Sequence, residues 1–457
     1  MAARDRRQTG HIDRRHGWIT VRCDPGRNQR RRHAVHPTGH CFKRKEQKRK
    51  SHAHLPAMKP ILTFCTALLC LFAVKTIAQT PETPLVSIDF EAMKKVRDAG
   101  KDIDLPRKKL IEKADKIWKE KPLRVVDGDM PPSGNKHDFF AIGKLAFPNP
   151  KTPNGMPYIR KDGVTNPEAD GDRYDLSRYN TTLSRVNELS LAWFYTKDEK
   201  YAKKAAELLR VWFLDPETRM NPNLNNASAL PGVHDGMPIG IIFSVALIRM
   251  VDHVKILALS KSWTPEDNKA LKKWFAEYRD WLLESDMGKI EAKAGNNHGS
   301  WYAAQVAAFS IYNGEFEKAK PMIELAKKQI AQQIEPDGSM PREYKRERSL
   351  HYSIYGLQAF SYLARCAEIV GGDLWNFKST DEKSLNLAFS FLYPYVTYQK
   401  EWPWKNIAKG QPLGRGVLEV YQWAAKAWPD SEFARVNPSI WKEVPAQSTD
   451  YLYWPRP

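Results

Sequence analysis

The sequence predicts an all-α protein, an (α/α) toroid or incomplete barrel of helical hairpins with long loops at its rim. Apolar residues recur at helical spacing through most of the chain after residue 79, and short turns separate these stretches. Alternating apolar and polar runs are few, so we expect little strand. Two segments rich in Pro, Gly, Asp and Asn, 128–182 and 214–236, break the helical pattern. Structureless segments of this length in a compact domain are usually functional loops.

The expected helices follow one another along the chain. Residues 183–213 predict a helix–turn–helix, with the turn at Thr196–Glu199, and 239–254 predicts an apolar helix. Thr264-Pro265-Glu266-Asp267 is typical of a helix start, with Pro at the first helical position and acids in the first turn. Further helices are expected at 298–312, 316–334, 350–370, 385–395 and 416–428.

The net charge of +19 at first suggests a nucleic-acid partner. Residues 1–57, however, hold 16 Lys and Arg against four Asp and Glu, a net charge of +12, and seven of the 12 His. They have no apolar period and are typical of a disordered basic arm. Residues 79–457 carry only +5. We therefore expect no nucleic-acid partner, and a mildly basic domain that suits an acidic substrate.

Residues 58–78 have the pattern of a signal peptide. Met58-Lys59-Pro60 precedes an apolar run from Ile61 to Val74, and small residues precede Gln79. The run is too short to span a bilayer comfortably, so no stable membrane insertion is expected. The predicted location is periplasmic or secreted, with 79–457 as the mature domain. Met58 is then the initiator, and 1–57 is either a gene-start artefact or a genuine basic arm.

Cysteine usage and motif content predict a simple architecture. Cys366 is the one cysteine in 79–457, so no intrachain disulfide is possible, and its helical context predicts a buried, small apolar residue. The sequence has no glycine-rich phosphate loop and no metal-ligand spacing such as HExxH or CxxC. We therefore expect neither a cofactor nor a metal.

Two segments, Asn296–Trp301 and Arg342–Tyr352, concentrate chemically useful side chains. The first offers an amide, an imidazole and an indole, and the second offers guanidiniums, an imidazole and a phenol. Such a set can hold and neutralise a sugar carboxylate and move a proton from carbon to oxygen. The alternatives are structural: Asn297 or Asn296 as a helix N-cap, His298 as a satisfied core histidine, and Tyr352 as a packing residue.

These segments resemble the alginate lyase family, the helical-barrel polysaccharide lyases, and their relatives that cut glucuronan. Residues 133–140, 155–163 and 212–224 resemble it too. The resemblance implies an (α/α) toroid with substrate-binding loops, an anionic polysaccharide as partner, and β-elimination of a uronate polymer. By it, Asn297 and His298 match the asparagine–histidine pair of the family. Tyr352 matches its catalytic tyrosine, and an arginine shortly before matches its carboxylate partner.

The identity of that arginine is ambiguous. The family residue lies six or seven positions before the tyrosine, where this chain has Arg346 and Lys345, while Arg348 lies four before. On a continuous helix Lys345 and Arg348 would share a face with Tyr352, and Arg346 would not. If a helix starts near Ser349, this argument fails. We favour Arg346 as catalytic and Arg348 as substrate-binding; the alternative is an exposed charge run that includes neighbouring glutamates, Glu343 and Glu347.

Further contacts with substrate are predicted in the loops and on aromatic side chains. Lys136 and His137 can meet sugar or carboxylate, although a loop of this composition is often only solvated. Aromatic rings can stack on sugars, although they are also ordinary core residues. The residues concerned are Tyr158, Trp301, Trp402 and Trp404.

Two other functions compete with a lyase. A glycoside hydrolase on a similar barrel needs two positioned carboxylic acids, and Asp138, Asp162 and Asp235 lie in loops. A non-catalytic glycan-binding surface protein is usually lipid-anchored, but neither Cys65 nor Cys70 follows a small residue. The sequence favours the lyase and leaves open the polymer, endo or exo action, the oligomeric state and metal dependence.

Overall fold

The computed structural model describes residues 80–100, 103–407, 415–434, 438–442 and 444–455. The chain divides into two compact units, Met1–Ile77 and Ala78–Pro457, and every described residue belongs to the second. The predictions for 1–57 and for the signal peptide 58–78 therefore fall outside the described residues.

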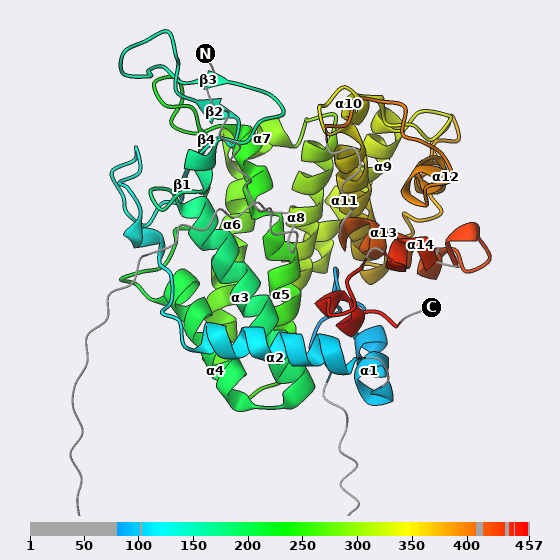
Figure 1. Ribbon diagram of the computed structural model, residues 1–457, viewed down its shortest axis with the longest axis horizontal. Coiled ribbons are helices and arrows are strands. Elements are labelled where there is room, and N and C mark those ends of the chain that lie inside the picture. Colours follow the sequence, from blue (N-terminus) through cyan, green and yellow to red (C-terminus); the bar gives the residue numbers. More distant parts are fainter. Residues whose placement is uncertain (1–79, 101–102, 408–414, 435–437, 443, 456–457) are drawn as a thin grey trace, which may run out of the picture. The chain divides into compact units, whose positions relative to one another are not determined.

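Helices dominate the described residues (Figure 1). They are α1 (Phe90–Ala99), α2 (Asp104–Trp118), α3 (Asp175–Thr196), α4 (Glu199–Leu209), α5 (Ala246–Leu257), α6 (Pro265–Glu284), α7 (Asp286–Glu291), α8 (Asn297–Tyr312), α9 (Phe316–Gln333), α10 (Pro341–Tyr344), α11 (Ser349–Ile369), α12 (Leu385–Val396), α13 (Arg415–Ala427) and α14 (Pro438–Lys442).

The predicted helices are present, with shifted ends. The α3–α4 pair is the expected helix–turn–helix, but α3 begins at Asp175, earlier than the predicted start at residue 183. The first turns were missed because some of their buried residues, such as Thr182, are polar and give no apolar pattern. The start of α6 is a capping box: the Thr264 side chain accepts from the backbone of Asp267, whose side chain accepts from the Thr264 backbone. The first turns of the predicted 239–254 helix are instead a 3-10 helix, Pro238–Ser244.

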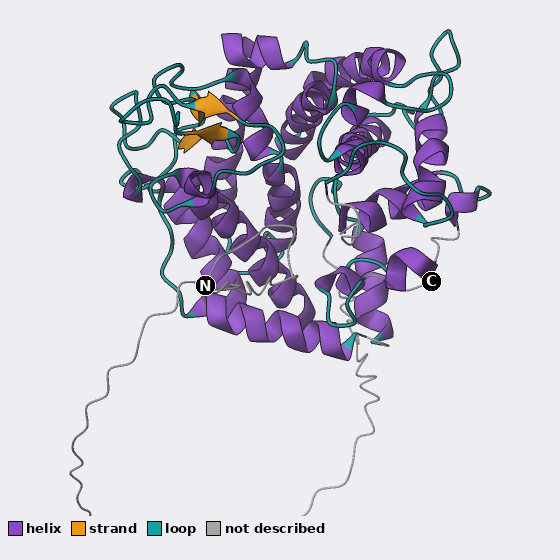
Figure 2. Cartoon of the chain, turned by 45° about the horizontal axis from the view of Figure 1, so that its top comes forward, coloured by secondary structure: helices purple, strands orange, loops and turns teal. Residues whose placement is uncertain are grey.

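The two long segments carry the strands and lie side by side. Strand β1 (Phe140–Ile142) pairs in parallel with β4 (Asn226–Ala229), which joins the first segment to the second. Strands β2 (Ala146–Phe147) and β3 (Ile159–Arg160) form an antiparallel pair within the first segment. Figure 2 shows the strands embedded in loops at one side of the helices. Strand content is low, as predicted.

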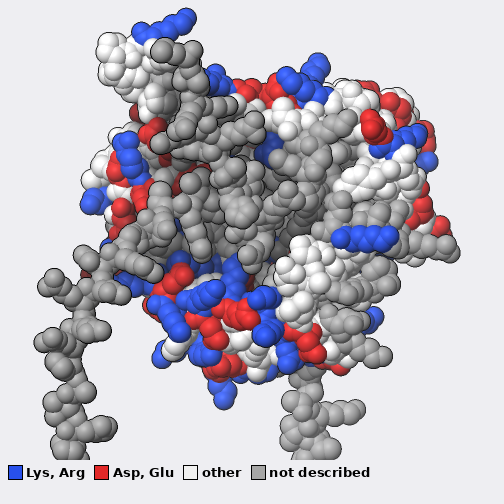
Figure 3. All heavy atoms as spheres, viewed as in Figure 1, with Lys and Arg blue, Asp and Glu red and all other residues white. Residues whose placement is uncertain are grey.

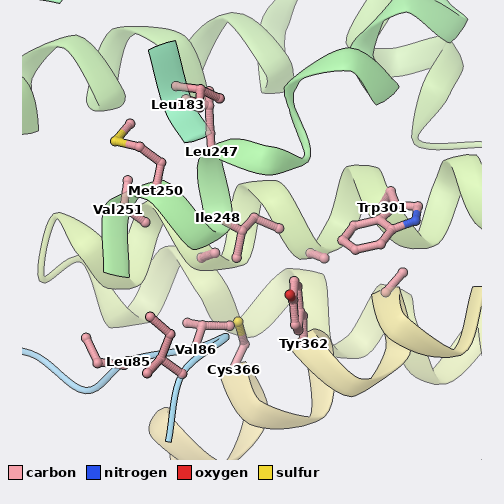
Figure 4. Packing of buried hydrophobic residues seen from close by; sticks show 14 of the residues in the cluster. Leu85, Val86, Leu183, Leu247, Ile248, Met250, Val251, Trp301, Tyr362 and Cys366 are labelled. Atoms are coloured by element: carbon pink, nitrogen blue, oxygen red, sulfur yellow. The ribbon is translucent and has the colours of Figure 1, made fainter. Parts of the chain in front are cut away.

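The core lies between the helices that form the central part of the unit. Helix α8 packs against α9 and α11, and α3 packs against α4 and α5. Nearly every residue of α8 is buried, as expected for a helix that is apolar all round. Figure 4 shows Leu183 of α3, Ile248 of α5 and Cys366 of α11 contributing to this core. Cys366 is free and buried, as its helical context predicted.

The outer surface carries both signs of charge. On the face seen in Figure 3, Lys and Arg are interspersed with Asp and Glu around α2. Lys109 and Glu112 of this helix form one such pair, with Nζ and Oε2 2.7 Å apart. Among the described residues, none of the helices has the length and apolar character needed to cross a membrane.

Candidate active site

The N-terminus of α8 presents the predicted amide and imidazole. Asn296 is the N-cap: its backbone is extended, and its side-chain oxygen accepts from the backbone N–H of His298. Asparagine is a favoured residue at this position because its oxygen satisfies an otherwise unpaired helix donor. Asn297 is therefore not the cap, and the side chains of Asn297 and His298 are available for other contacts in the first turn.

Asn297 is bound to a buried carboxylate. Its backbone N and its side-chain Nδ2 donate to Oε1 and Oε2 of Glu343, both at 2.8 Å. Glu343 belongs to α10 and is only 3% exposed. Burial raises the pKa of Glu343, although the hydrogen bonds from Asn297 act in the opposite direction. The interpretation of Glu343 as part of an exposed charge run is wrong, because two donors from α8 draw it into the protein.

His298 is bound to a second buried glutamate. Its ring Nδ1 lies 2.6 Å from Oε1 of Glu291, the last residue of α7. The Glu291 side chain is 3% exposed and that of His298 is 18% exposed. The imidazole is thus held on one side by a carboxylate and reaches the surface on the other.

Tyr352 is paired with Arg346. The guanidinium Nη2 donates to the phenol oxygen at 2.9 Å, and Cζ lies 4.0 Å from the centre of the tyrosine ring. Because α11 begins at Ser349, Arg346 lies in the turn before the helix, and the helical spacing that disfavoured it does not apply. A cationic donor on the phenol oxygen stabilises negative charge there.

These residues form one cluster across α8, α10 and α11. Gly356 lies one helical turn after Tyr352, and a Cβ placed on it would be 3.8 Å from Cβ of Asn297. Arg346 and His298 lie close enough to lower the pKa of Glu343, which binds Asn297. The structure therefore brings together the four predicted catalytic residues, Asn297, His298, Arg346 and Tyr352.

The first long segment reaches this cluster. Asp162 Oδ1 lies 3.7 Å from Nη2 of Arg346. Gly163 has a positive φ of 76°, and a Cβ placed there would lie 2.9 Å from Cγ of Glu347. Only a residue without a side chain can combine this backbone conformation with such a close approach. Asp162 and Gly163 thus lie against the turn that carries Arg346.

The predicted substrate-binding residues Arg348, Lys136, His137 and Tyr158 are more dispersed. Arg348 and Lys136 are exposed. His137 Nδ1 lies 2.7 Å from the carbonyl oxygen of Arg219, and the Tyr158 hydroxyl donates to Glu168 at 2.9 Å. Within the described ranges, no hydrogen bond or ion pair joins these four side chains to the cluster.

The stacking role predicted for Trp301 is contradicted. Trp301 is 2% exposed, and its ring packs against Tyr355 and Tyr362, with centroids 4.9 and 5.6 Å away. Figure 4 shows Trp301 and Tyr362 within the core. The indole therefore presents no open face to a sugar. Trp402 and Trp404 are half-buried and pack on each other and on Tyr344.

The carboxylates considered for a glycoside hydrolase lie in different surroundings. Asp138 is buried and accepts from the amides of Asn221 and Asn223 at 2.8 and 3.1 Å. Asp162 is half exposed beside Arg346, and Asp235 is exposed. In the part of the chain that the structure describes, no group of three or more His, Cys, Asp or Glu could hold a metal ion.

The sequence interpretation missed both glutamates of the site. Glu343 lies in a segment already singled out, and its burial could be suspected only if the partner Asn297 were known. Glu291 is the last residue of α7 and its partner His298 is the second residue of α8. No periodicity connects two helices across a turn, so the sequence carried no signal for this contact.

Comparison with known proteins agrees with this geometry. The alginate lyase family profile matches residues 127–402. The chain is 34% identical to an alginate lyase from Bacteroides ovatus, with a TM-score of 0.76 over 81% of this chain and 99% of that one. Alginate lyase A1-III in complex with a tetrasaccharide has 14% identity and a TM-score of 0.50, over 81% and 96% of the two chains, and supports the fold alone. No curated protein matches.

These matches confirm the predicted helical toroid class and the prediction of a polysaccharide lyase. They also confirm the resemblance found in the sequence, whose segments lie within the region that the profile matches. The chain belongs to the alginate lyase family.

Proposed function

We propose that this lyase cleaves alginate by β-elimination and leaves an unsaturated uronate at the new chain end. The observation that carries the proposal is the contact between Arg346 Nη2 and the Tyr352 hydroxyl, 2.9 Å, next to the first turn of α8. This contact holds the Tyr352 phenol, which can exchange protons, next to the guanidinium cation of Arg346. Both are requirements of elimination at a uronate.

The chemistry follows from the substrate. A uronate carries its carboxylate on C5 and its glycosidic oxygen on C4. Tyr352 takes the proton from C5, and the electron pair of that bond forms the C4–C5 double bond while the C4–O4 bond breaks. The leaving oxygen then takes a proton from the same phenol. Asn297 and Arg346 stabilise the charge that develops on the carboxylate. His298 adds an imidazole beside this pair.

The choice of alginate is supported by the matching family profile and by the Bacteroides ovatus protein, which is described as an alginate lyase. Glucuronan is the next candidate because mannuronate and glucuronate both present H5 and O4 on the same side, so that one tyrosine could serve either. An anionic polysaccharide also suits the net charge of +5 on residues 79–457.

We place the enzyme in the periplasm or outside the cell. The support is the charged, apolar and small-residue pattern of residues 58–78. Intact-mass analysis of the protein exported by its natural host tests this, with Gln79 expected as the first residue. Recovery of residues 1–57 on the exported protein would contradict it.

A polysaccharide panel tests the activity. Purified enzyme is incubated with polymannuronate, polyguluronate, glucuronan and a neutral glucan, and unsaturated product is followed by ultraviolet absorbance and mass spectrometry. We expect unsaturated oligomers from an alginate polymer and none from the neutral glucan. Products heavier by one water, without the double bond, would identify a hydrolase. Cleavage of glucuronan alone would overturn the assignment of alginate.

A further inference from the structure

The contact between Glu291 and His298 constrains the imidazole. A carboxylate accepts hydrogen bonds and does not donate them. With Oε1 2.6 Å from Nδ1, the ring hydrogen of a neutral His298 therefore lies on Nδ1. Glu291 is buried, so the carboxylate end of this contact is shielded from water.

The opposite nitrogen, Nε2, then carries a lone pair. Among the described residues, no hydrogen bond from protein engages it, and the His298 side chain is 18% exposed. A neutral imidazole in this tautomer can accept a proton through Nε2 but cannot donate a hydrogen bond to a substrate carboxylate from there.

We propose that Glu291 is a positioning residue that fixes His298 in the Nδ1–H tautomer and leaves Nε2 as a hydrogen-bond acceptor. Neutralisation of the substrate carboxylate then falls to Asn297 and Arg346. This division of roles rests on the proposed function, whereas the tautomer itself does not.

Nuclear magnetic resonance of protein labelled with nitrogen-15 in histidine tests the tautomer without reference to activity. The described chain has His137, His234, His253, His298 and His351, and the variant His298→Gln identifies the signals of His298. In the wild type we expect Nδ1 to be protonated and Nε2 not. The reverse pattern in the wild-type protein overturns the proposal, whether or not any glutamate variant folds.

Glu291→Gln separates positioning from packing. Its amide has the size of the carboxylate but can donate as well as accept, so the tautomer is no longer fixed. We expect the Nε2–H form to appear and kcat to fall by roughly 10- to 100-fold, the loss typical when the hydrogen-bond partner of a metal-bound histidine is changed, while KM stays near the wild-type value. Glu291→Asp, which keeps the carboxylate, should recover part of the Nδ1–H tautomer and part of the wild-type kcat.

The exposed Glu284 at the end of α6 provides the matched control. Glu284→Gln should change neither the spectrum nor turnover. An unchanged tautomer in Glu291→Gln overturns the positioning role. A changed tautomer with unchanged kcat overturns the role of Nε2 as acceptor. If the wild type gives no unsaturated product while the tautomer responds to Glu291→Gln, the proposed function fails and the positioning stands.

Discussion

Asn297 gives both its backbone N–H and its side-chain amide to one carboxylate, that of Glu343, with both donor–acceptor distances at 2.8 Å. The two bonds attach Asn297, the first residue of α8, to Glu343 in α10. Glu343 lies three residues before Arg346. They fix the Asn297 amide relative to the arginine. A single glutamate thus couples the two segments that carry the proposed chemistry.

Glu343→Gln should lower turnover. The glutamine amide can face only one of the two Asn297 donors with its oxygen, so the amide of Asn297 loses its fixed orientation. Small misplacements of a catalytic group can reduce rate by up to about 10²-fold. Initial rates on the preferred polymer measure the effect.

Glu347→Gln is the matched control for that variant. Glu347 lies in the same segment but pairs with the exposed Lys405 at 2.7 Å, and its side chain is 29% exposed. It should retain nearly normal turnover. Equal losses in the two variants would contradict a special role for Glu343.

The pH dependence of stability should also reveal Glu343. Burial raises its pKa in the folded protein above the ordinary value of 4.5, so the folded state binds more protons than the unfolded state above that pH. The contribution of Glu343 to the free energy of unfolding is therefore present at low pH and is lost as the pH rises through the raised pKa. Denaturant unfolding at several pH values should show the wild type losing stability relative to Glu343→Gln across this window. The opposite slope would show that the carboxylate is stabilised by the fold.

Arg346→Ala and Arg348→Ala should both weaken turnover, with the larger loss at Arg346. Arg346 contacts the phenol of Tyr352, whereas Arg348 is exposed at the start of α11. Loss of one fixed donor to developing charge reduces kcat by roughly 10²–10³-fold. Rates of the two variants on the same polymer decide the matter. If both match the wild type, Lys345 and Arg342 become the candidates.

The helices were predictable where apolar residues recur every three or four positions, as in α6, α8 and α11. Helix α2 was not, because its buried Leu110, Ala114 and Ile117 stand among many lysines and give a weak pattern. The two long segments were recognisable by composition. Their pairing through β1 and β4 is a tertiary contact between residues far apart in sequence, and no local pattern predicts it.

The site was predictable in residue type but not in geometry. The choice between Arg346 and Arg348 depended on where α11 begins, and helix boundaries are the least certain part of any sequence interpretation. Once Ser349 starts the helix, Arg346 is free to fold back onto Tyr352. The prediction for Trp301 was wrong for a different reason. It lies in a segment with functional residues, but helical rotation turns it into the core.

Trp301→Phe should therefore affect stability more than binding. The indole fills a buried site against Tyr355 and Tyr362, and its loss leaves a gap that should reduce the free energy of unfolding by roughly 1–3 kcal/mol. KM should remain near the wild-type value. Trp118→Phe, at an exposed position, is the control and should change stability little. A raised KM with unchanged stability would restore the stacking role.

Tyr352→Phe removes one oxygen and keeps the ring. If the phenol only packs, the variant loses about one hydrogen bond, roughly 0.5–1.5 kcal/mol of stability, and activity survives. If it transfers the proton from C5 to the leaving oxygen, the rate should fall by about 10²–10⁴-fold while the ring still packs beneath Arg346. Melting curves establish that the variant is folded, and the appearance of unsaturated product measures the rate. A folded variant that forms unsaturated product at near the wild-type rate would remove Tyr352 from the chemistry, because no other change separates it from the wild type.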